Sequence, residues 1–154
     1  MNRANAAILL VEDNPKDLKL TLHALKSRNL ANKIEVARDG QEALDYLFCQ
    51  GPHANRSPDD PPRVVLLDLK LPGIDGLEVL RAVKGDPRTR TIPVVILTAS
   101  KEEKDLMESY NLGVNAYIQK PVDFDQFRGM VDHIGLFWLV VNQPPPPPQP
   151  PGVK

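Results

Sequence analysis

The sequence predicts an α/β protein built on a doubly wound parallel sheet of five strands. Five short apolar runs recur along the 154 residues, and most are followed by a stretch with helical spacing. Successive strand–helix units of this kind form right-handed crossovers, which give a parallel sheet with helices on both faces. Apart from Glu35 in the second run, the runs are apolar rather than alternating, which indicates strands buried on both sides. The expected strand order is 2-1-3-4-5.

The predicted strands share short length and almost wholly apolar composition. They cover residues 7–11, 34–37, 64–67, 94–97 and 116–118. The first helix opens with Asn14-Pro15, an N-cap followed by proline at the first helical position. The second helix follows Asp39-Gly40, and the third stops near Gly85. Their expected inward faces are Leu18, Leu22 and Leu25, then Ala43, Leu44 and Leu47, then Leu77, Leu80 and Val83.

The last two helices differ in how clearly they are patterned. The fourth, over 101–111, has a weak apolar face through Leu106, Met107 and Tyr110, so we expect it to shift most readily. The fifth has a longer stripe at helical spacing. Its members are Phe124, Phe127, Val131, Ile134, Trp138 and Val141.

We expect one domain over residues 1–141 and a flexible proline-rich tail over 142–154. A chain of 154 residues supports one domain with a core, but not two. The tail holds seven prolines and predicts an extended, polyproline-like segment. Segment 51–62 is polar with four prolines, which predicts a long surface loop.

Composition argues against several classes of partner. The formal net charge is -1 with acids and bases interspersed, so we expect no binding to nucleic acid or to a membrane surface. The N-terminus lacks the apolar segment of a signal peptide, and the longest apolar run, 136–141, is too short to span a bilayer. The single cysteine, Cys49, excludes an internal disulfide. The expected location is the cytoplasm.

Polar residues follow two neighbouring strands where each of them ends. Glu12 and Asp13 come directly after the first strand, and Asp68 comes after the third. In the expected order these strands meet at the topological switch point, so three carboxyl groups converge there. Close like charges raise one another's pKa unless a cation lies between them, and hard oxygen ligands favour Mg²⁺. The sequence predicts a Mg²⁺ site with Asp13 and Asp68 as direct ligands and Glu12 acting partly through water.

A hydroxyl and an ammonium reach the same edge from the last two strands. Lys120 is able to pair with a carboxylate and then with a phosphoryl oxygen, and a cis bond to Pro121 would aim it into the crevice. Thr98 adds the hydroxyl. Taken singly, each residue has another interpretation: a helix-capping acid pair, a surface lysine and a strand-forming threonine. Together they favour a carboxylate that receives a phosphoryl group.

Four segments in this order resemble the receiver domains of two-component response regulators. They are ILLVEDN at 8–14, LLDLKLPG at 66–73, TA at 98–99 and YIQKP at 117–121. The resemblance covers roughly residues 7–134 and implies a flavodoxin-like (βα)5 fold. The loop before the third strand and the apolar Phe137-Trp138 further resemble stand-alone regulators associated with bacterial phytochrome kinases.

By this resemblance, Asp68 accepts a phosphoryl group from the phosphohistidine of a partner histidine kinase, of phytochrome type. Glu12, Asp13, Asp68 and the backbone carbonyl of Lys70 would hold Mg²⁺. The kinase would contact the first helix and the loops around Asp68.

The resemblance also implies roles for the residues on the last two strands. Lys120 would pair with the phosphoryl oxygens, and Thr98 would donate a hydrogen bond to them. Tyr117 would be the switch aromatic that turns inward when Thr98 moves, although a half-buried tyrosine on an edge strand is the alternative. Lys70 and Ser100 occupy positions that modulate the attacking water.

Two other functions stay open on the sequence. The first is a phosphorylation-independent binding module that retains only the fold. The second is an aspartyl-phosphate hydrolase of the dehalogenase type, which needs a second acid where this chain has Lys70. The apolar residues at 136–141 exceed what one core-facing stripe buries, which predicts a homodimer through the fourth helix, fifth strand and fifth helix. A helix end folded onto its own domain is the alternative.

Overall fold

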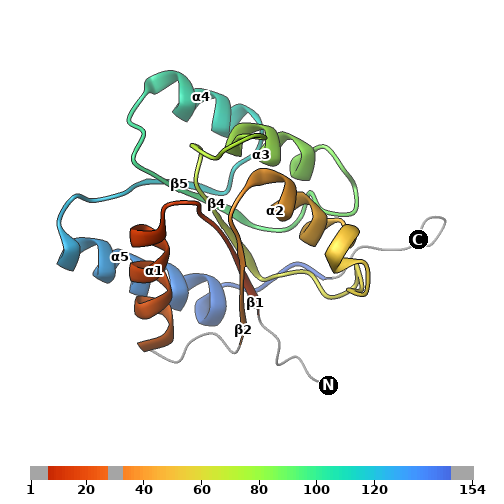
Figure 1. The fold of residues 1–154 in the computed structure, drawn as a ribbon, viewed down its shortest axis with the longest axis horizontal. Coiled ribbons are helices and arrows are strands. Elements are labelled where there is room, and N and C mark those ends of the chain that lie inside the picture. The colour runs from red at the N-terminus through yellow and green to blue at the C-terminus, as the bar shows by residue number, and fades with distance from the viewer. Residues whose placement is uncertain (1–6, 28–32, 147–154) are drawn as a thin grey trace.

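The centre of the computed structural model is a five-stranded parallel sheet with the order β2-β1-β3-β4-β5 (Figure 1). The structure describes residues 7–27 and 33–146. The strands are β1 (Ala7–Val11), β2 (Lys33–Ala37), β3 (Val64–Leu67), β4 (Val94–Thr98) and β5 (Ala116–Gln119). The predicted fold class and strand order are confirmed.

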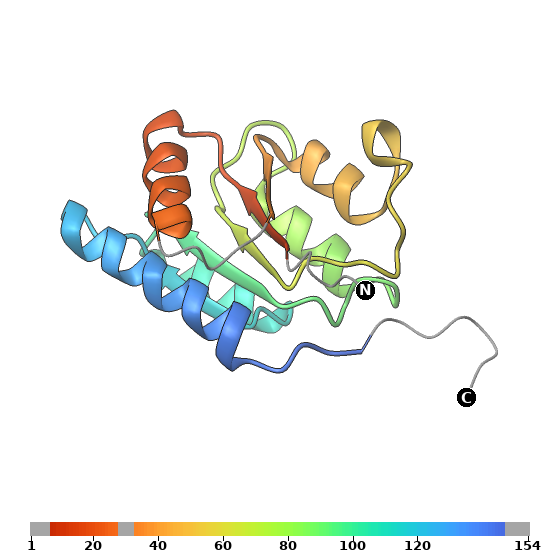
Figure 2. The ribbon, with the colours of Figure 1, turned by 90° about the horizontal axis from the view of Figure 1, so that it is seen from below.

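Helices cover both faces of the sheet, as Figures 1 and 2 show. On one face lie α1 (Pro15–Ser27) and α5 (Phe124–Leu136); on the other lie α2 (Gly40–Leu47) and α3 (Gly76–Lys84), with α4 (Glu103–Asn111) beside α3. Side chains of β1 alternate between the faces, with Leu9 packing towards α2 and α3 and Leu10 towards α1 and α5. Every residue of β3 and β4 is buried, which explains their uninterrupted apolar sequence.

The predicted face of α4 is wrong. The helix begins at Glu103, two residues later than predicted, and its three apolar side chains are 40–63% exposed. They are Leu106, Met107 and Tyr110. The inward positions are instead Asp105 and Ser109. Asp105 accepts a hydrogen bond from the Ser100 hydroxyl, and the Ser109 hydroxyl donates to the Asp105 carbonyl. The hydrogen bond from Ser100, which lies outside the helix, therefore favours the side that carries Asp105 as the inward one.

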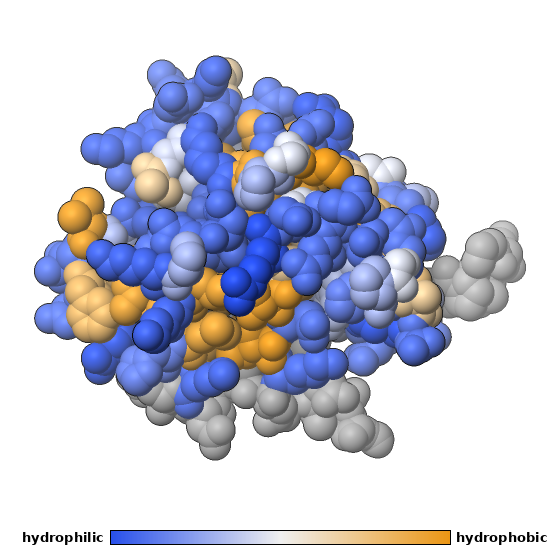
Figure 3. All heavy atoms as spheres, in the orientation of Figure 1, coloured by the Kyte–Doolittle hydropathy of each residue, from blue (hydrophilic) through white to orange (hydrophobic). Residues whose placement is uncertain are grey.

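The predicted stripe of α5 is correct in its middle and wrong at both ends. Phe127, Val131 and Ile134 are buried, whereas Phe124 and Val141 are exposed. The helix continues into a π-helical segment, η2 (Phe137–Val141), and this wider turn breaks the 3.6-residue period on which the stripe depends. Figure 3 shows apolar atoms at the left edge of the molecule. Phe124, the first residue of α5, and Val122, two residues before it, are both exposed.

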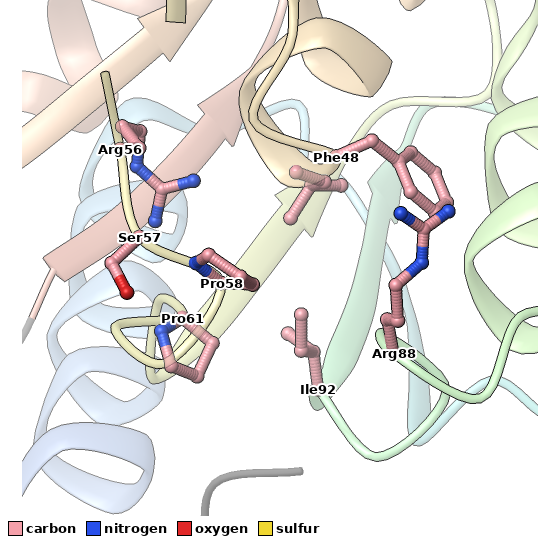
Figure 4. Close-up of a pocket in the computed structure, with 8 residues that line it drawn as sticks. Phe48, Arg56, Ser57, Pro58, Pro61, Arg88 and Ile92 are labelled. Atoms are coloured by element: carbon pink, nitrogen blue, oxygen red, sulfur yellow. The ribbon is translucent and has the colours of Figure 1, made fainter. Parts of the chain in front are cut away.

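The proline-containing loop 51–62 packs against α2. It opens with a 3₁₀ turn, η1 (Gly51–His53). The Arg56 guanidinium lies 3.8 Å from the centre of the Tyr46 ring and donates to the carbonyls of Tyr46 and Asp60. Figure 4 shows the loop facing Phe48 and Ile92 across a hollow. The volume of this hollow is about 50 Å³. The hollow is far too small for an organic ligand, so we interpret this region as structural.

The predicted tail begins where η2 ends, after Val141. Residues 147–154 lie outside the described part of the chain, so the division into a domain and a tail stays a prediction. Among the described residues, no helix has the length and apolar character needed to cross a membrane.

Candidate functional site

Backbone hydrogen bonds hold the predicted site residues at one edge of the sheet. The amides of Glu12, Asp68 and Lys120 each donate to a carbonyl of the neighbouring strand or its end, at 3.0, 3.1 and 2.7 Å. Each residue therefore extends its parallel ladder one step beyond the last strand residue. The carboxyl ends of these strands carry the side chains to a common crevice, as predicted.

The suggested cis bond between Lys120 and Pro121 is wrong, because no peptide bond within the described residues is cis. The amide of Lys120 instead donates to the Thr98 carbonyl, which keeps the lysine in register with β4. Pro121 follows without an amide hydrogen, so the ladder ends there. The strand register between β4 and β5 therefore directs the Lys120 side chain towards the site without a cis peptide bond.

Lys120 is the centre of the site. Its side chain is 8% exposed, and its ammonium donates to Glu12 at 2.8 Å, to Asp17 at 2.8 Å and to Asp68 at 3.0 Å. An ammonium has three hydrogens, so these three carboxylates use all of its donors. Glu12 and Asp68 are buried with it.

Three of the carboxylates could hold a metal ion. Oxygen atoms of Glu12, Asp13 and Asp68 lie within 4.8 Å of one another, and the Asp13 side chain opens this group to solvent. The donor set is all oxygen, and Glu12 and Asp68 of this set, with Asp17, place three carboxylates on the one ammonium of Lys120. Such an excess of negative charge on hard ligands fits a divalent cation.

Burial and the neighbouring charges shift the pKa values of Glu12 and Lys120. Burial raises the pKa of Glu12 to about 7, against the lowering effect of its hydrogen bond to Lys120, and the Asp68 charge adds to the rise. Burial alone would lower the pKa of Lys120, but hydrogen bonds to Asp17 and Glu12 and the charge of Asp68 outweigh burial and raise it. Lys120 is therefore charged at neutral pH, whereas the Glu12 carboxyl group exchanges between its protonated and ionised forms near pH 7.

Asp68 is held from two sides. One carboxylate oxygen accepts the Lys70 amide at 3.2 Å, and the other accepts the Lys120 ammonium. A Cβ on Gly76, the first residue of α3, would lie 2.3 Å from the Asp68 carbonyl oxygen. Only glycine allows this approach, which the sequence did not reveal. The helix itself is fixed by a capping box between Asp75 and Glu78.

Thr98, Tyr117 and α4 meet at Ser100. The buried Thr98 hydroxyl accepts from the Ser100 amide at 3.4 Å, and the Tyr117 hydroxyl donates to the Ser100 carbonyl at 3.2 Å. Burial raises the pKa of Tyr117. Within the described residues, no hydrogen bond joins Thr98 to Asp68. The switch roles of Thr98 and Tyr117 stay predictions.

Two acidic residues at this edge were missed by the sequence analysis. Asp17, in the first turn of α1, pairs with Lys120; the only signal in the sequence was an acid near a helix start, which the helix dipole also explains. Asp105 of α4 is 6% exposed and lies 3.8 Å from the Lys70 ammonium. Asp13, Lys70 and Asp105 border one side of a hollow of about 450 Å³ beside the site.

Comparison with known proteins identifies this class of site. The profile of the response regulator receiver domain matches residues 8–132, so the chain belongs to the receiver-domain family. Receiver domains are signalling modules that interact with histidine kinases.

Particular relatives are known both as sequences and as structures. Response regulator Rcp1 of Synechocystis sp. is 42% identical over 132 residues, which cover 86% of this chain and 88% of Rcp1. The phosphorylated cyanobacterial phytochrome response regulator RcpA superposes with a TM-score of 0.86 at 42% identity, covering 92% of this chain and 99% of that one. The bacteriophytochrome response regulator AtBRR has a TM-score of 0.70 at 59% identity, with coverage of 90% and 98%.

A further structure bears on the metal. The Mn²⁺-bound form of Rcp1 has a TM-score of 0.85 at 39% identity and covers 91% of this chain and 99% of that one. In this chain the acidic cluster of Glu12, Asp13 and Asp68 offers the oxygen ligands that could hold a divalent metal ion.

Proposed function

We propose that Asp68 is the residue that accepts the phosphoryl group, from a phosphohistidine of a partner kinase. The observation that carries this assignment is the environment of its carboxylate. One oxygen lies 3.0 Å from the buried Lys120 ammonium, and Glu12 and Asp13 lie beside it. The Asp68 carboxylate, as the nucleophile, therefore lies beside the Lys120 ammonium, which supplies positive charge for the phosphoryl oxygens.

The chemistry is a single displacement. An oxygen of Asp68 attacks phosphorus, the bond between phosphorus and the histidine nitrogen breaks, and the imidazole leaves with the electron pair. Lys120 compensates charge on the phosphoryl oxygens, and the Lys70 amide already orients the carboxylate. The metal is proposed to be Mg²⁺, held by Glu12, Asp13, Asp68 and the backbone carbonyl of Lys70; when bound, it neutralises phosphoryl charge.

The proposed consequence is a change at α4 and β5. Thr98 would turn its hydroxyl to the new phosphoryl group, and Tyr117 would follow inward. Both residues already bond to Ser100, whose hydroxyl donates to Asp105 of α4. A movement of Thr98 would therefore reach α4 directly.

The proposed partner is a histidine kinase of phytochrome type, because RcpA and AtBRR bear phytochrome names. We place the pair in the cytoplasm, where ATP supplies the kinase with its phosphoryl group. The protein would catalyse only its own phosphorylation and slow dephosphorylation. In support of that limit, the position where a dehalogenase-type hydrolase needs a second acid is Lys70, whose ammonium lies near Asp105.

A homodimer through α4, β5 and α5 is a further part of the proposal. Exposed apolar side chains occur on α4 and at both ends of α5 with η2. They are Leu106, Met107, Tyr110, Val122, Phe124, Leu136, Phe137, Val140 and Val141. Size-exclusion chromatography with light scattering tests it at tens of micromolar. A monomer in both phosphorylation states would count against the dimer.

Intact mass spectrometry tests the central assignment. With Mg²⁺ and acetyl phosphate, the wild type should gain one phosphoryl group that is stable in acid and labile in base. Asp68→Asn should gain none, and Asp125→Asn, an exposed aspartate of α5, should behave as wild type. An adduct that persists in Asp68→Asn overturns the assignment. Sustained turnover of many phosphomonoesters would favour the hydrolase, and full partner binding without phosphorylation would favour the binding module.

A further inference from the structure

Asp17 differs from the other partners of Lys120. Glu12 and Asp68 belong to the group of carboxylates whose oxygens lie within 4.8 Å of one another, and Asp17 does not. Its carboxylate nevertheless lies 2.8 Å from the Lys120 ammonium, as close as that of Glu12. Within residues 7–27 and 33–146, Asp17 is thus the one carboxylate on this ammonium that lies outside the proposed metal ligands.

The position of Asp17 is fixed by the start of α1. The Asn14 side chain caps the helix by accepting the amides of Lys16 at 2.9 Å and Asp17 at 3.1 Å. The backbone amide of Asn14 in turn donates to the second carboxylate oxygen of Glu12, at 3.1 Å. A closed set of contacts therefore links Glu12, Asn14, Asp17 and Lys120.

A bound cation changes the balance within this set. In this structure Lys120 donates two of its three hydrogens to Glu12 and Asp68, two of the carboxylates that are proposed to hold the metal ion. An ammonium and a divalent cation on the same carboxylates repel each other. The ammonium needs a partner of opposite charge elsewhere, and Asp17 already provides one.

We infer that Asp17 is a positioning residue, which keeps the Lys120 ammonium paired on the α1 side and so lets a divalent cation take Glu12 and Asp68. The inference rests on the proposed function, since it concerns Mg²⁺ at the same site. Without the Asp17 charge, the ionic partners that remain to Lys120 among the described residues are both proposed metal ligands, and Lys120 competes with the cation for them. Asp17 acts through Lys120 and touches neither the metal ligands nor the phosphoryl group.

Calorimetric titration of the full chain with Mg²⁺ near pH 8 tests the inference. Asp17→Asn should raise the dissociation constant about tenfold. Asp125→Asn, which also removes an acid from the first turn of a helix, should change it less than twofold. In a Lys120→Gln background, Asp17→Asn should lose most of its effect, because the competitor is gone. An equal effect in both backgrounds, or none in the wild-type background, overturns the inference.

A second measurement does not depend on a Lys120 variant that folds. In protein with ¹⁵N-labelled lysine, the Lys120 ammonium hydrogens should stay protected from exchange with solvent after Mg²⁺ is added to the wild type. In Asp17→Asn, Mg²⁺ should abolish this protection. Equal protection in both proteins overturns the inference. A wild type that binds no Mg²⁺ overturns the proposed metal site as well, so the two failures are distinguishable.

Discussion

A lysine lies at each end of the parallel strands, and each ammonium donates to three oxygens. The pKa values of these two lysines shift in opposite directions. At the carboxyl edge, Lys120 contacts three carboxylates, which raise its pKa. At the amino edge, Lys84 contacts the carbonyls of Arg90 and Ile92 and the side-chain oxygen of Asn115, at 2.9–3.1 Å. These acceptors are neutral, and burial lowers the pKa of Lys84.

The same geometry therefore serves two purposes. The Lys84 contacts tie the end of α3 to the loops before β4 and β5 through hydrogen bonds to neutral oxygens. At the Lys120 edge the carboxylates outnumber the ammonium, which leaves an unbalanced negative site. Lys84 has a structural role, because it donates hydrogen bonds to neutral oxygens. Lys120 only partly neutralises its carboxylates, which leaves negative charge for a second cation. Each prediction below tests one side of this contrast.

Lys120→Gln should give the largest effect. It leaves buried carboxylates without their counter-ion, which costs about 3–5 kcal/mol of unfolding free energy near pH 8. Saturating Mg²⁺ should restore much of the loss. Lys84→Gln is the matched control: it loses hydrogen bonds to neutral oxygens, for about 1–2 kcal/mol, and Mg²⁺ should not compensate. Urea unfolding with EDTA or with Mg²⁺ measures both. Equal losses in the two variants would remove the contrast.

The stability of the metal-free protein should fall as pH rises from about 5 to 8. Burial raises the pKa of Glu12 to about 7, so in this range the folded protein binds more protons than the unfolded chain. The expected loss is on the order of 2–3 kcal/mol. Lys120 does not contribute here, because its raised pKa affects stability only above about pH 10.

Saturating Mg²⁺, which binds the ionised carboxylate, should flatten or reverse this fall. Urea midpoints at three pH values, with EDTA or with Mg²⁺, measure the effect. Glu12→Gln should abolish the slope in EDTA. A metal-free wild type whose stability is constant over this range would show that Glu12 is ionised throughout.

Two glycines allow the edges to be compared through the backbone. A Cβ on Gly76 would meet the Asp68 backbone at 2.3 Å, so Gly76→Ala should cost about 1–3 kcal/mol and displace the phosphoacceptor. A Cβ on Gly113 would meet the Lys84 side chain at 3.6 Å, an ordinary contact, but the φ of Gly113 is +100°. Gly113→Ala should cost about 1–2 kcal/mol through backbone strain alone.

Phosphorylation separates the two glycine variants better than stability does. Gly76→Ala should slow labelling by acetyl phosphate about tenfold, and Gly113→Ala should leave the rate unchanged. Stopped reactions analysed by intact mass, with both proteins checked for folding, give these rates. Similar rates would mean that Asp68 tolerates a shift of α3.

The sequence was sufficient for the parts of the site that the backbone determines. Buried parallel strands fix where Glu12, Asp68 and Lys120 lie, because each continues a ladder whose register follows from the apolar run before it. Asp17 and Asp105 could not be found in this way. Their roles depend on where helices dock and how side chains turn, and an acid on a helix has the same pattern whether it faces solvent or a lysine.

The helices show the same limit. On α4, apolar spacing predicted an inward face, but the hydrogen bond from Ser100 to Asp105 turns the polar side towards the protein. On α5, the stripe ends where η2 changes the helical period. Pattern analysis fails where a specific polar contact or an irregular turn replaces the average helix.

The smallest effect is expected at α4, the part of the carboxyl edge without a charge cluster. Asp105 accepts from the Ser100 hydroxyl at 2.6 Å and lies 3.8 Å from the exposed Lys70 ammonium. Asp105→Asn keeps the shape and a possible acceptor but loses the charge, so about 1 kcal/mol of stability should be lost. Glu103→Gln, at an exposed position on the same helix, should be neutral.

Hydrogen exchange locates this loss. In Asp105→Asn the amides of α4 should exchange several-fold faster, while those of α3 keep their wild-type protection, because α4 buries few apolar side chains and depends on this contact. Uniform acceleration in both helices would mean that Asp105 supports the whole domain. Unchanged exchange in α4 would mean that the Ser100 contact does not anchor it, and the proposed path from Thr98 to α4 would have to run through Tyr117.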